Sequence, residues 1–190
     1  MPIAPDTKNW TWVLDRACPA CGFDAARASF ADVPALAVGC AGRLAAVARG
    51  PRARVRPDES TWSPLEYAAH VRDVCRIFTF RVAVAAGSAA RDPRLPAYDA
   101  RVDTVDGMPA FADWDQDATA VADRYAEQDP RTVAAELELA VARVAAVIAA
   151  VPEVDRERRV RRGDGSTFTV DSLVRYFLHD LAHHVHDVDR

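Results

Sequence analysis

A group of histidines in the segment HDLAHHVHDV has the composition and spacing of a metal site. His179 and His183 are four residues apart, and side chains at this separation share one face of an α-helix. Two imidazoles on adjacent turns are typical ligands of Zn²⁺, Ni²⁺ or Fe²⁺, which need at least one further donor. His184 is expected to point about 100° away from this pair, and His186 is an alternative partner for His183. A hydrogen-bonded helix end without metal is the competing interpretation.

The third donor is predicted to be His70, because it is the only histidine outside this group. It lies at the edge of an apolar helical stripe in the segment TWSPLEYAAHVRDV, a position that also suits an ordinary core histidine. Glu66 and Asp73 are close enough along the helix to orient its ring. The sequence therefore predicts a divalent-metal site formed by His70, His179 and His183.

Two residues of the last helix are candidates for catalysis. Tyr176, one turn before His179, could donate a proton or a hydrogen bond to a substrate. Asp180 stands where the metalloprotease motif HExxH has its general-base glutamate. Aspartate is shorter by one methylene group, so peptidase activity is not favoured. A metal-activated water and a metal-activated thiol are both candidate nucleophiles.

The composition is that of a soluble globular protein. Of the 190 residues, 50% are apolar and 27% are charged, and the formal net charge is −4, whereas nucleic-acid binding needs clustered excess Lys and Arg. The basic run RERRVRR contains a glutamate and is more typical of a solvated strand face. We find neither a signal peptide nor a segment long enough to span a membrane. We therefore expect a cytoplasmic protein that binds a small-molecule substrate, but no nucleic acid and no membrane.

The chain contains four cysteines, which are expected to be reduced in the cytoplasm. Cys18 and Cys21 form the turn CPACG, and a CxxC pair supplies half of a zinc knuckle. Cys40 and Cys75 are too far apart in the sequence to supply the other half. A packed turn, a reversible disulfide and a functional thiol near the metal are all compatible with this segment.

Helical periodicity predicts four main helices and hence a four-helix bundle. The first begins near Asp32, whose side chain is a candidate cap. The second begins at Ser63, where an S-x-x-E capping box gives the strongest start signal in the chain. The third follows an Asp-Pro break at 129–130, and Thr169 can cap the fourth. We therefore predict an all-α fold with long crossover connections.

The remaining segments connect these helices. Residues 88–113 are rich in proline and aspartate and are predicted to form a long loop. The aspartates of the following DWDQD are expected to lie at the start of a helix that runs to Gln128. The segment RERRVRRGDGSTFTV alternates around a GDG turn and predicts a short β-hairpin. We expect residues 1–31 to be an irregular lead-in packed on the bundle, and residues 32–190 to form a single metal-binding domain.

The two histidine segments together resemble the DinB-like (YfiT-like) metalloprotein superfamily. The resemblance rests on WSPLEYAAHVRDV, on HDLAHHVHDV, and on DWDQD followed by an Asp-Pro break between them. It covers nearly all of the chain. The lead-in TWVLDRACPACGFDA is similar to an actinobacterial subgroup of that superfamily.

This resemblance implies a four-helix bundle, often dimeric, with a divalent metal on a histidine triad. In this chain the triad corresponds to His70, His179 and His183. Characterised relatives include thiol-dependent S-transferases and isomerases that use mycothiol, bacillithiol or glutathione. The implied function is a metal-dependent thiol S-transferase, in which zinc, or alternatively nickel or iron, holds the thiol as a thiolate. A metal-dependent hydrolase and a non-catalytic metal- or stress-responsive binding protein are the alternatives, and a homodimer is the expected assembly.

Overall fold

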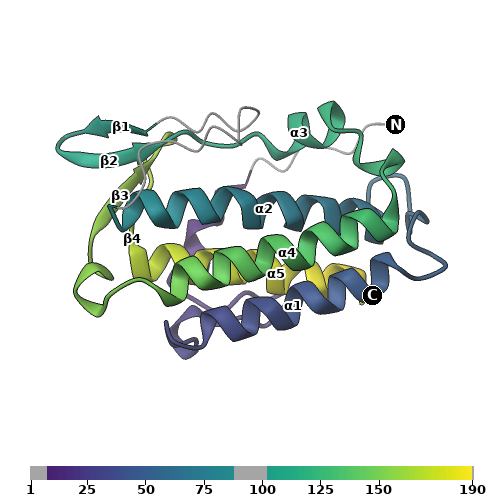
Figure 1. Cartoon of the computed structure of the whole chain (residues 1–190), viewed down its shortest axis with the longest axis horizontal. Coiled ribbons are helices and arrows are strands. Elements are labelled where there is room, and N and C mark those ends of the chain that lie inside the picture. Colours follow the sequence, from purple (N-terminus) through teal and green to yellow (C-terminus); the bar gives the residue numbers. More distant parts are fainter. Residues whose placement is uncertain (1–7, 88–101, 190) are drawn as a thin grey trace.

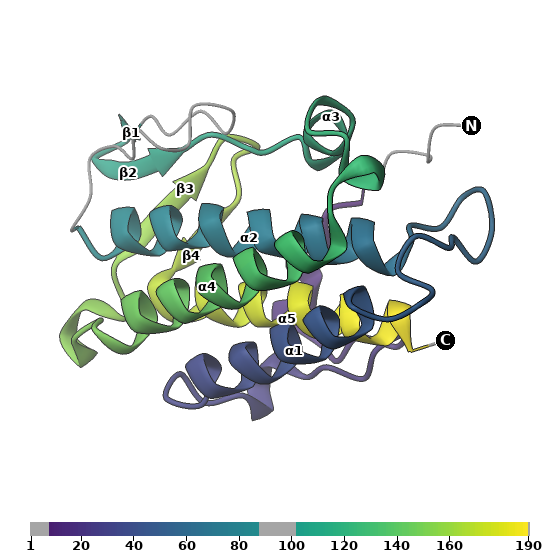
Figure 2. The ribbon, with the colours of Figure 1, turned by 45° about the vertical axis from the view of Figure 1, so that its right-hand side comes forward.

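The computed structural model describes residues 8–87 and 102–189, which form a four-helix bundle with a small sheet at one end (Figure 1). Helix α2 packs against both α4 and α5, and α1 closes the bundle by packing against the same two helices (Figure 2). The predicted four-helix bundle is confirmed, although the sheet means that the fold is not purely helical. The bundle helices are α1 (Val33–Ala48), α2 (Pro64–Ala85), α4 (Pro130–Ala149) and α5 (Val170–Val188).

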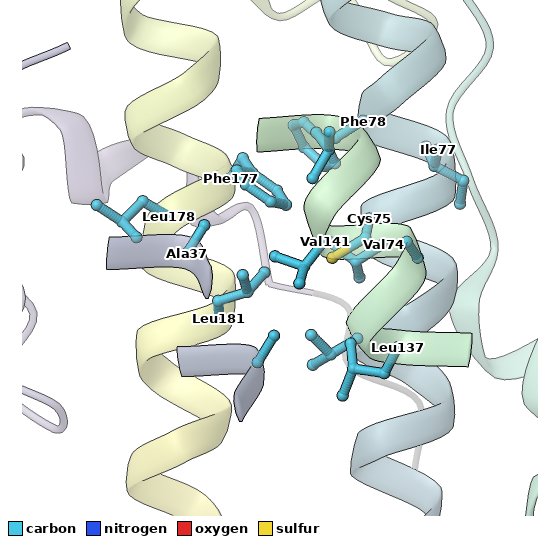
Figure 3. Close-up of a cluster of buried hydrophobic side chains, with 14 of the residues drawn as sticks. Ala37, Val74, Cys75, Ile77, Phe78, Leu137, Val141, Phe177, Leu178 and Leu181 are labelled. Atoms are coloured by element: carbon cyan, nitrogen blue, oxygen red, sulfur yellow. The ribbon is translucent and has the colours of Figure 1, made fainter. Parts of the chain in front are cut away.

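Apolar side chains from all four helices form the core (Figure 3). The rings of Phe78 in α2 and Phe177 in α5 lie 5.1 Å apart, measured between centroids. The inner face of α1 is largely alanine, including the fully buried Ala37 and Ala41, so this helix can approach its neighbours closely. Along the described residues we find no helix with the length and apolarity that crossing a bilayer demands.

The start of α2 is fixed by the predicted capping box. The Ser63 hydroxyl accepts from the backbone N–H of Glu66, and the Glu66 carboxylate accepts from the backbone N–H of Ser63 at 2.9 Å. Arg56 donates to the same carboxylate from its Nε at 2.9 Å. Because His70 lies one turn after Glu66, this cap also sets the position of the histidine along the helix.

Replacing Ser63 with alanine is expected to destabilise the protein by about 1 kcal/mol, the usual cost of removing a helix N-cap. Ser63 is buried, so water cannot replace its hydroxyl. Urea denaturation followed by circular dichroism measures the change. Ser60→Ala is a suitable control, because Ser60 is exposed and its hydroxyl donates to the Asp58 carboxylate rather than capping α2. Equal stability of the wild type and the Ser63 variant would contradict this role.

The sheet has the strand order β1-β2-β3-β4. Its outer pairs are antiparallel and the central β2–β3 pair is parallel. The predicted hairpin around the GDG turn is confirmed as β3 and β4, and Gly165 in this turn has a φ of 92°. The strands are β1 (Val102–Val105), β2 (Met108–Phe111), β3 (Arg159–Arg162) and β4 (Thr167–Thr169).

The prediction of a long loop over residues 88–113 is wrong for residues 102–111, which form the β1–β2 hairpin. The rest of that prediction, over 88–101, lies outside the described residues. Asp106 and Gly107 both have positive φ, 53° and 77°, which is the backbone of a type I′ turn. The Asp-Gly pair therefore carried a hairpin signal that the density of prolines and aspartates obscured.

The helix predicted to run to Gln128 is shorter than expected. Helix α3 (Gln116–Ala122) stops because Arg124 adopts a left-handed φ of 49°, and a 3-10 turn, η4 (Tyr125–Glu127), follows. The start agrees with the prediction, since the Asp115 carboxylate accepts from the backbone N–H of Ala118 at 2.8 Å.

The sequence predicts two further helix caps, at Thr169 and Asp32. Thr169 caps α5 by accepting from the backbone N–H of Ser172 at 3.1 Å, as expected. Asp32 makes no side-chain cap on α1. Its carboxylate instead accepts from the hydroxyl of Ser29 at 2.6 Å, which ties the helix to the residues that precede it.

The described part of the lead-in contains two 3-10 turns, η1 (Trp10–Leu14) and η2 (Ala25–Arg27), and both pack on α5. Trp10 stacks on Trp12 with 5.7 Å between ring centroids. Arg175 of α5 donates from Nη1 to the Ala25 carbonyl at 2.8 Å. These contacts bring the amino-terminal segment against the histidine-bearing helix.

Candidate metal centre

The predicted metal ligands lie in two different clusters of donor atoms. His70 of α2 lies with Asp180 and His184 of α5, and their candidate ligand atoms are all within 4.8 Å of one another. We call these three residues the His70 cluster. His179 and His183 belong to a second cluster, with donors from the lead-in. Across the described residues, the structure thus keeps the predicted i, i+4 pair together but does not group it with His70.

The geometry of α5 explains this division. The helix carries two overlapping i, i+4 pairs, His179 with His183 and Asp180 with His184, and they point about 100° apart. The rotation of α5 about its own axis decides which pair faces α2. Burial of the apolar face of α5 sets that rotation. As a result His184 lies beside His70, although the sequence predicted that it points away from the site. The apolar face consists of Leu173, Val174, Phe177, Leu178, Leu181 and Val185.

His70 is fully buried between two aromatic rings. It stacks on Trp114 with 5.4 Å between centroids and 6° between planes, and Trp62 packs on it at 5.2 Å. Its Nε2 lies 3.6 Å from Asp180 Oδ1. Within the described residues, neither ring nitrogen of His70 has a hydrogen-bond partner. Unpaired buried donors and acceptors are rare in native proteins, and a bound ion would satisfy these atoms.

His184 completes the His70 cluster. Its Nε2 lies 3.2 Å from Asp180 Oδ1, and its Nδ1 lies 3.0 Å from Asp187 Oδ2. The ring also packs on Tyr67 at 5.1 Å. Carboxylates that bind the far nitrogen of a ligating histidine commonly fix the ring orientation in metal sites. Asp187 therefore directs Nε2 of His184 toward the cluster.

The cluster combines neutral and charged donors. Burial lowers the pKa of His70, so this ring is neutral at pH 7. Burial also opposes a charge on His184, but its contacts with Asp180 and Asp187 raise the pKa to about 9. Burial alone would raise the pKa of Asp180, but His184 and His70 hold it below its usual value. Two imidazoles and one carboxylate are a common donor set for zinc and non-haem iron. These residues therefore fit a divalent ion. Binding of that ion would displace a proton from His184.

Two adjoining cavities meet at this cluster. The first, of about 410 Å³, is bordered by His184 and Asp180, and the second, of about 620 Å³, is also bordered by Asp180. Tyr176 borders both. Both predicted catalytic candidates, Tyr176 and Asp180, therefore lie at the junction of the cavities. Other residues common to the two linings are Lys8, Trp10, Gln116 and Asp117.

Tyr176 is positioned as a hydrogen-bond donor to these cavities. Arg162 donates from Nη1 to its hydroxyl oxygen at 3.2 Å, which leaves the phenolic proton for another acceptor. Burial raises the pKa of Tyr176 against the opposing effect of Arg162, so the phenol stays protonated at neutral pH. Arg162, expected on a solvated strand face, is instead 8% exposed and paired with Asp164 at 2.6 Å.

The second cluster consists of Cys18, Cys21, His179 and His183, and we call it the Cys18 cluster. Both cysteines are free thiols. Burial lowers the pKa of His179 to about 4 and also lowers the pKa of His183. Because the cysteines lie with this histidine pair, they leave the coordination sphere of the His70 cluster open to other ligands.

Sequence reasoning did not identify Asp180 and His184 as metal-ligand candidates. The available signal was the second i, i+4 pair on the same helix. The sequence does not show the rotation of α5, and the resemblance of HDLAH to HExxH points to Asp180 as a general base instead.

Comparison with known proteins agrees with this architecture. A sequence model of the DinB superfamily matches residues 45–188, a range that includes the His70 cluster but not Cys18 or Cys21. The solved structure of YfiT from Bacillus subtilis, described as a probable metal-dependent hydrolase with an unusual four-helix bundle topology, is similar to this chain with a TM-score of 0.62. The two share 14% identity over 84% of this chain and 82% of YfiT, which shows a common fold. No curated protein matches the sequence.

Proposed function

Because the chain belongs to the DinB superfamily, we propose that it is a metal-dependent enzyme whose divalent ion is held by His70, Asp180 and His184. One observation carries this proposal. Both ring nitrogens of the fully buried His70 lack a hydrogen-bond partner within the described part of the chain, and His70 lies with Asp180 and His184 of α5 beside a cavity. A merely structural histidine of the bundle core would have its ring nitrogens satisfied.

The chain supplies three donors and a nearby acid. A divalent ion at this position acts as a Lewis acid that lowers the pKa of a water or a thiol. Three protein donors leave a coordination position for that nucleophile. Tyr176, kept protonated by burial, donates a hydrogen bond or proton to the group that develops negative charge. The rings of Trp62 and Trp114 pack on His70 and help to keep it buried.

The first candidate reaction is transfer of a low-molecular-weight thiol to an electrophile. The two adjoining cavities support it, since a transferase must hold two substrates side by side. Neither Cys18 nor Cys21 belongs to the His70 cluster, so an exogenous thiol has room there. The similarity of the lead-in to an actinobacterial subgroup makes mycothiol the first thiol to test.

The second candidate is metal-dependent hydrolysis, with water in place of the thiol. The fold similarity to YfiT, described as a probable hydrolase, favours it. A donor set of two imidazoles and one carboxylate also occurs in zinc hydrolases.

Arg81 indicates the charge of the substrate. Its guanidinium borders the larger cavity, is buried, and lies 4.6 Å from the ring of Phe111. Burial and the charge of Arg162 lower its pKa to about 10, so it remains a cation at neutral pH. Among the described residues its hydrogen bond goes to the Ala112 carbonyl and it has no carboxylate partner. A substrate carboxylate would supply that partner.

We expect the metal-loaded protein to bind mycothiol, bacillithiol or glutathione, and the metal-free protein and His70→Ala to bind none of them. Protein purified without a histidine tag is stripped, reloaded with Zn²⁺, Ni²⁺ or Fe²⁺, and titrated with each thiol in a calorimeter. Electrophiles with and without a carboxylate, and matching esters, then report turnover. If no thiol binds but the metal-loaded protein hydrolyses esters, the protein is a metal-dependent hydrolase. If it binds its ion but shows neither thiol transfer nor hydrolysis, it is a metal-binding protein. Identical ion content in wild type and His70→Ala would overturn the proposed site.

A further inference from the structure

We propose that Cys18, Cys21, His179 and His183 bind a second ion, a structural Zn²⁺, distinct from the ion of the His70 cluster. The candidate ligand atoms of these four side chains all lie within 4.8 Å of one another. This second site lies between the lead-in and α5, and its cysteines precede the part of the chain matched by the family. It therefore adds to the proposed function and does not depend on it.

The donor chemistry is that of zinc. Two thiols with C-x2-C spacing and two imidazoles with H-x3-H spacing are the ligands and spacings of Cys2His2 structural zinc sites. Two sulfurs and two nitrogens favour tetrahedral zinc over the harder cations that prefer oxygen. Four protein ligands fill a tetrahedral ion, so this site has no position for a substrate. Two thiolates would also neutralise the charge of the ion.

The CPACG turn already has the shape that such a site needs. The backbone N–H of Cys18 donates to the Phe23 carbonyl and that of Gly22 donates to the Cys18 carbonyl, both at 2.8 Å. Gly22 has a φ of 74°, which a residue with a side chain rarely adopts. These bonds close the turn and bring Cys21 back beside Cys18.

The histidines are oriented to complete the site. Nδ1 of His183 lies 3.7 Å from the Sγ of Cys18, although the two residues are 165 positions apart. Its Nε2 lies 4.0 Å from Asp187 Oδ1, so Nδ1 is the ring nitrogen turned toward the thiols. Nε2 of His179 is buried and has no hydrogen-bond partner among the described residues.

Burial and aromatic rings cover part of the site. Cys18 is 2% exposed and His179 is 4% exposed. Trp10 packs on His183 with 5.0 Å between centroids, and Phe23 packs on His179 at 5.6 Å. Cys21 and His183 are half-buried, and the histidine pair also borders the cavity of about 410 Å³. Zinc here would fasten the lead-in to α5.

X-ray absorption at the zinc edge of the wild-type protein tests the site without any substitution. Zinc-loaded, untagged, full-length protein is expected to contain two ions per chain and to show sulfur neighbours at about 2.3 Å. The His70 cluster contains no sulfur, so this distance reports the Cys18 cluster alone. Loading with Co²⁺ adds a second readout, since thiolate-bound tetrahedral cobalt gives a charge-transfer band.

Variants then assign the two ions. Cys18→Ser and Cys21→Ser are expected to lose one ion per chain together with the sulfur signal and the cobalt band. Cys40→Ser is the matched control, because Cys40 lies outside both clusters and should retain both ions. His70→Ala should lose the other ion and keep the cobalt band. The sulfur signal is expected even if the His70 cluster has neither proposed activity, so the experiment distinguishes the two proposals.

Three results would overturn the proposal. The first is zinc-loaded wild-type protein with no sulfur neighbour. The second is a Cys18–Cys21 disulfide in protein purified under reducing conditions. The third is a single ion per chain lost equally in His70→Ala and His183→Ala, which would place all three histidines on one metal.

Discussion

Asp180→Asn is expected to reduce both the affinity of the His70 cluster for its ion and the turnover of the enzyme by at least about 100-fold. Asp180 is the only anionic donor of the cluster, and its Oδ1 lies 3.2 Å from His184 Nε2 and 3.6 Å from His70 Nε2. Asparagine has nearly the same shape but no charge, so it removes the electrostatic attraction and preserves the packing. Competition with a chromophoric chelator measures the affinity, and steady-state kinetics measure the turnover.

Asp171→Asn provides a matched control on the same helix. Asp171 forms an ion pair with Arg175 at 2.8 Å and lies in the first turn of α5, away from both clusters. We expect it to retain ion affinity and turnover, and circular dichroism should show the wild-type helix content for both variants. If Asp180→Asn bound its ion as tightly as the wild type, the ligand set would have to be one without Asp180, such as the predicted trio of His70, His179 and His183.

Asp73→Asn is expected to destabilise the fold by about 3–5 kcal/mol, the range found when a buried ion pair loses one partner. Asp73 is fully buried and accepts from Nε and Nη2 of Arg72, each at 2.9 Å. Arg76 donates to it at 2.9 Å and the Tyr125 hydroxyl donates at 2.7 Å. The neutral amide would leave the buried guanidinium of Arg72 without its main counter-charge. Urea denaturation of the metal-free proteins measures the difference.

The loss of stability in Asp73→Asn should be smaller in acid. Burial would raise the pKa of Asp73, but Arg72 and Tyr125 hold it below its usual value. The carboxylate therefore stabilises the fold fully above the unfolded-state pKa of about 4 and loses this effect as the pH falls through the folded-state pKa. The stability gap between wild type and Asp73→Asn should narrow as the pH falls below about 4. Glu138→Gln, which breaks an exposed pair with Arg49, should change the free energy of unfolding little at any pH. A loss of stability as large as that of Asp73→Asn would contradict the argument that burial makes the Asp73 pair strong.

Local signals in the sequence predicted the helices well. The predicted capping box at Ser63 and the predicted cap at Thr169 fix the starts of α2 and α5, and both are present. Such interactions involve residues three apart, so they do not depend on the rest of the fold. The parallel pairing of β2 with β3 joins residues about 50 positions apart, and nothing in either strand specifies it.

The division of the α5 histidines could not be predicted for a related reason. The i, i+4 rule finds the pair His179–His183 and, equally, the pair Asp180–His184. A rotation of about 100° decides which pair faces His70, and that rotation results from packing against α1, α2 and the lead-in. The same limit applies to Cys18, whose proximity to His183 depends on the path of the amino-terminal segment.

The two ligand pairs of α5 are offset by one residue along a single rigid helix. Such a helix cannot turn to improve one pair without displacing the other. With zinc held by the Cys18 cluster, the angle at which Asp180 and His184 meet His70 is therefore fixed from the opposite side of the helix. If the His70 cluster holds nickel or iron, a shortage of zinc would then lower activity at that cluster even when its own metal is plentiful.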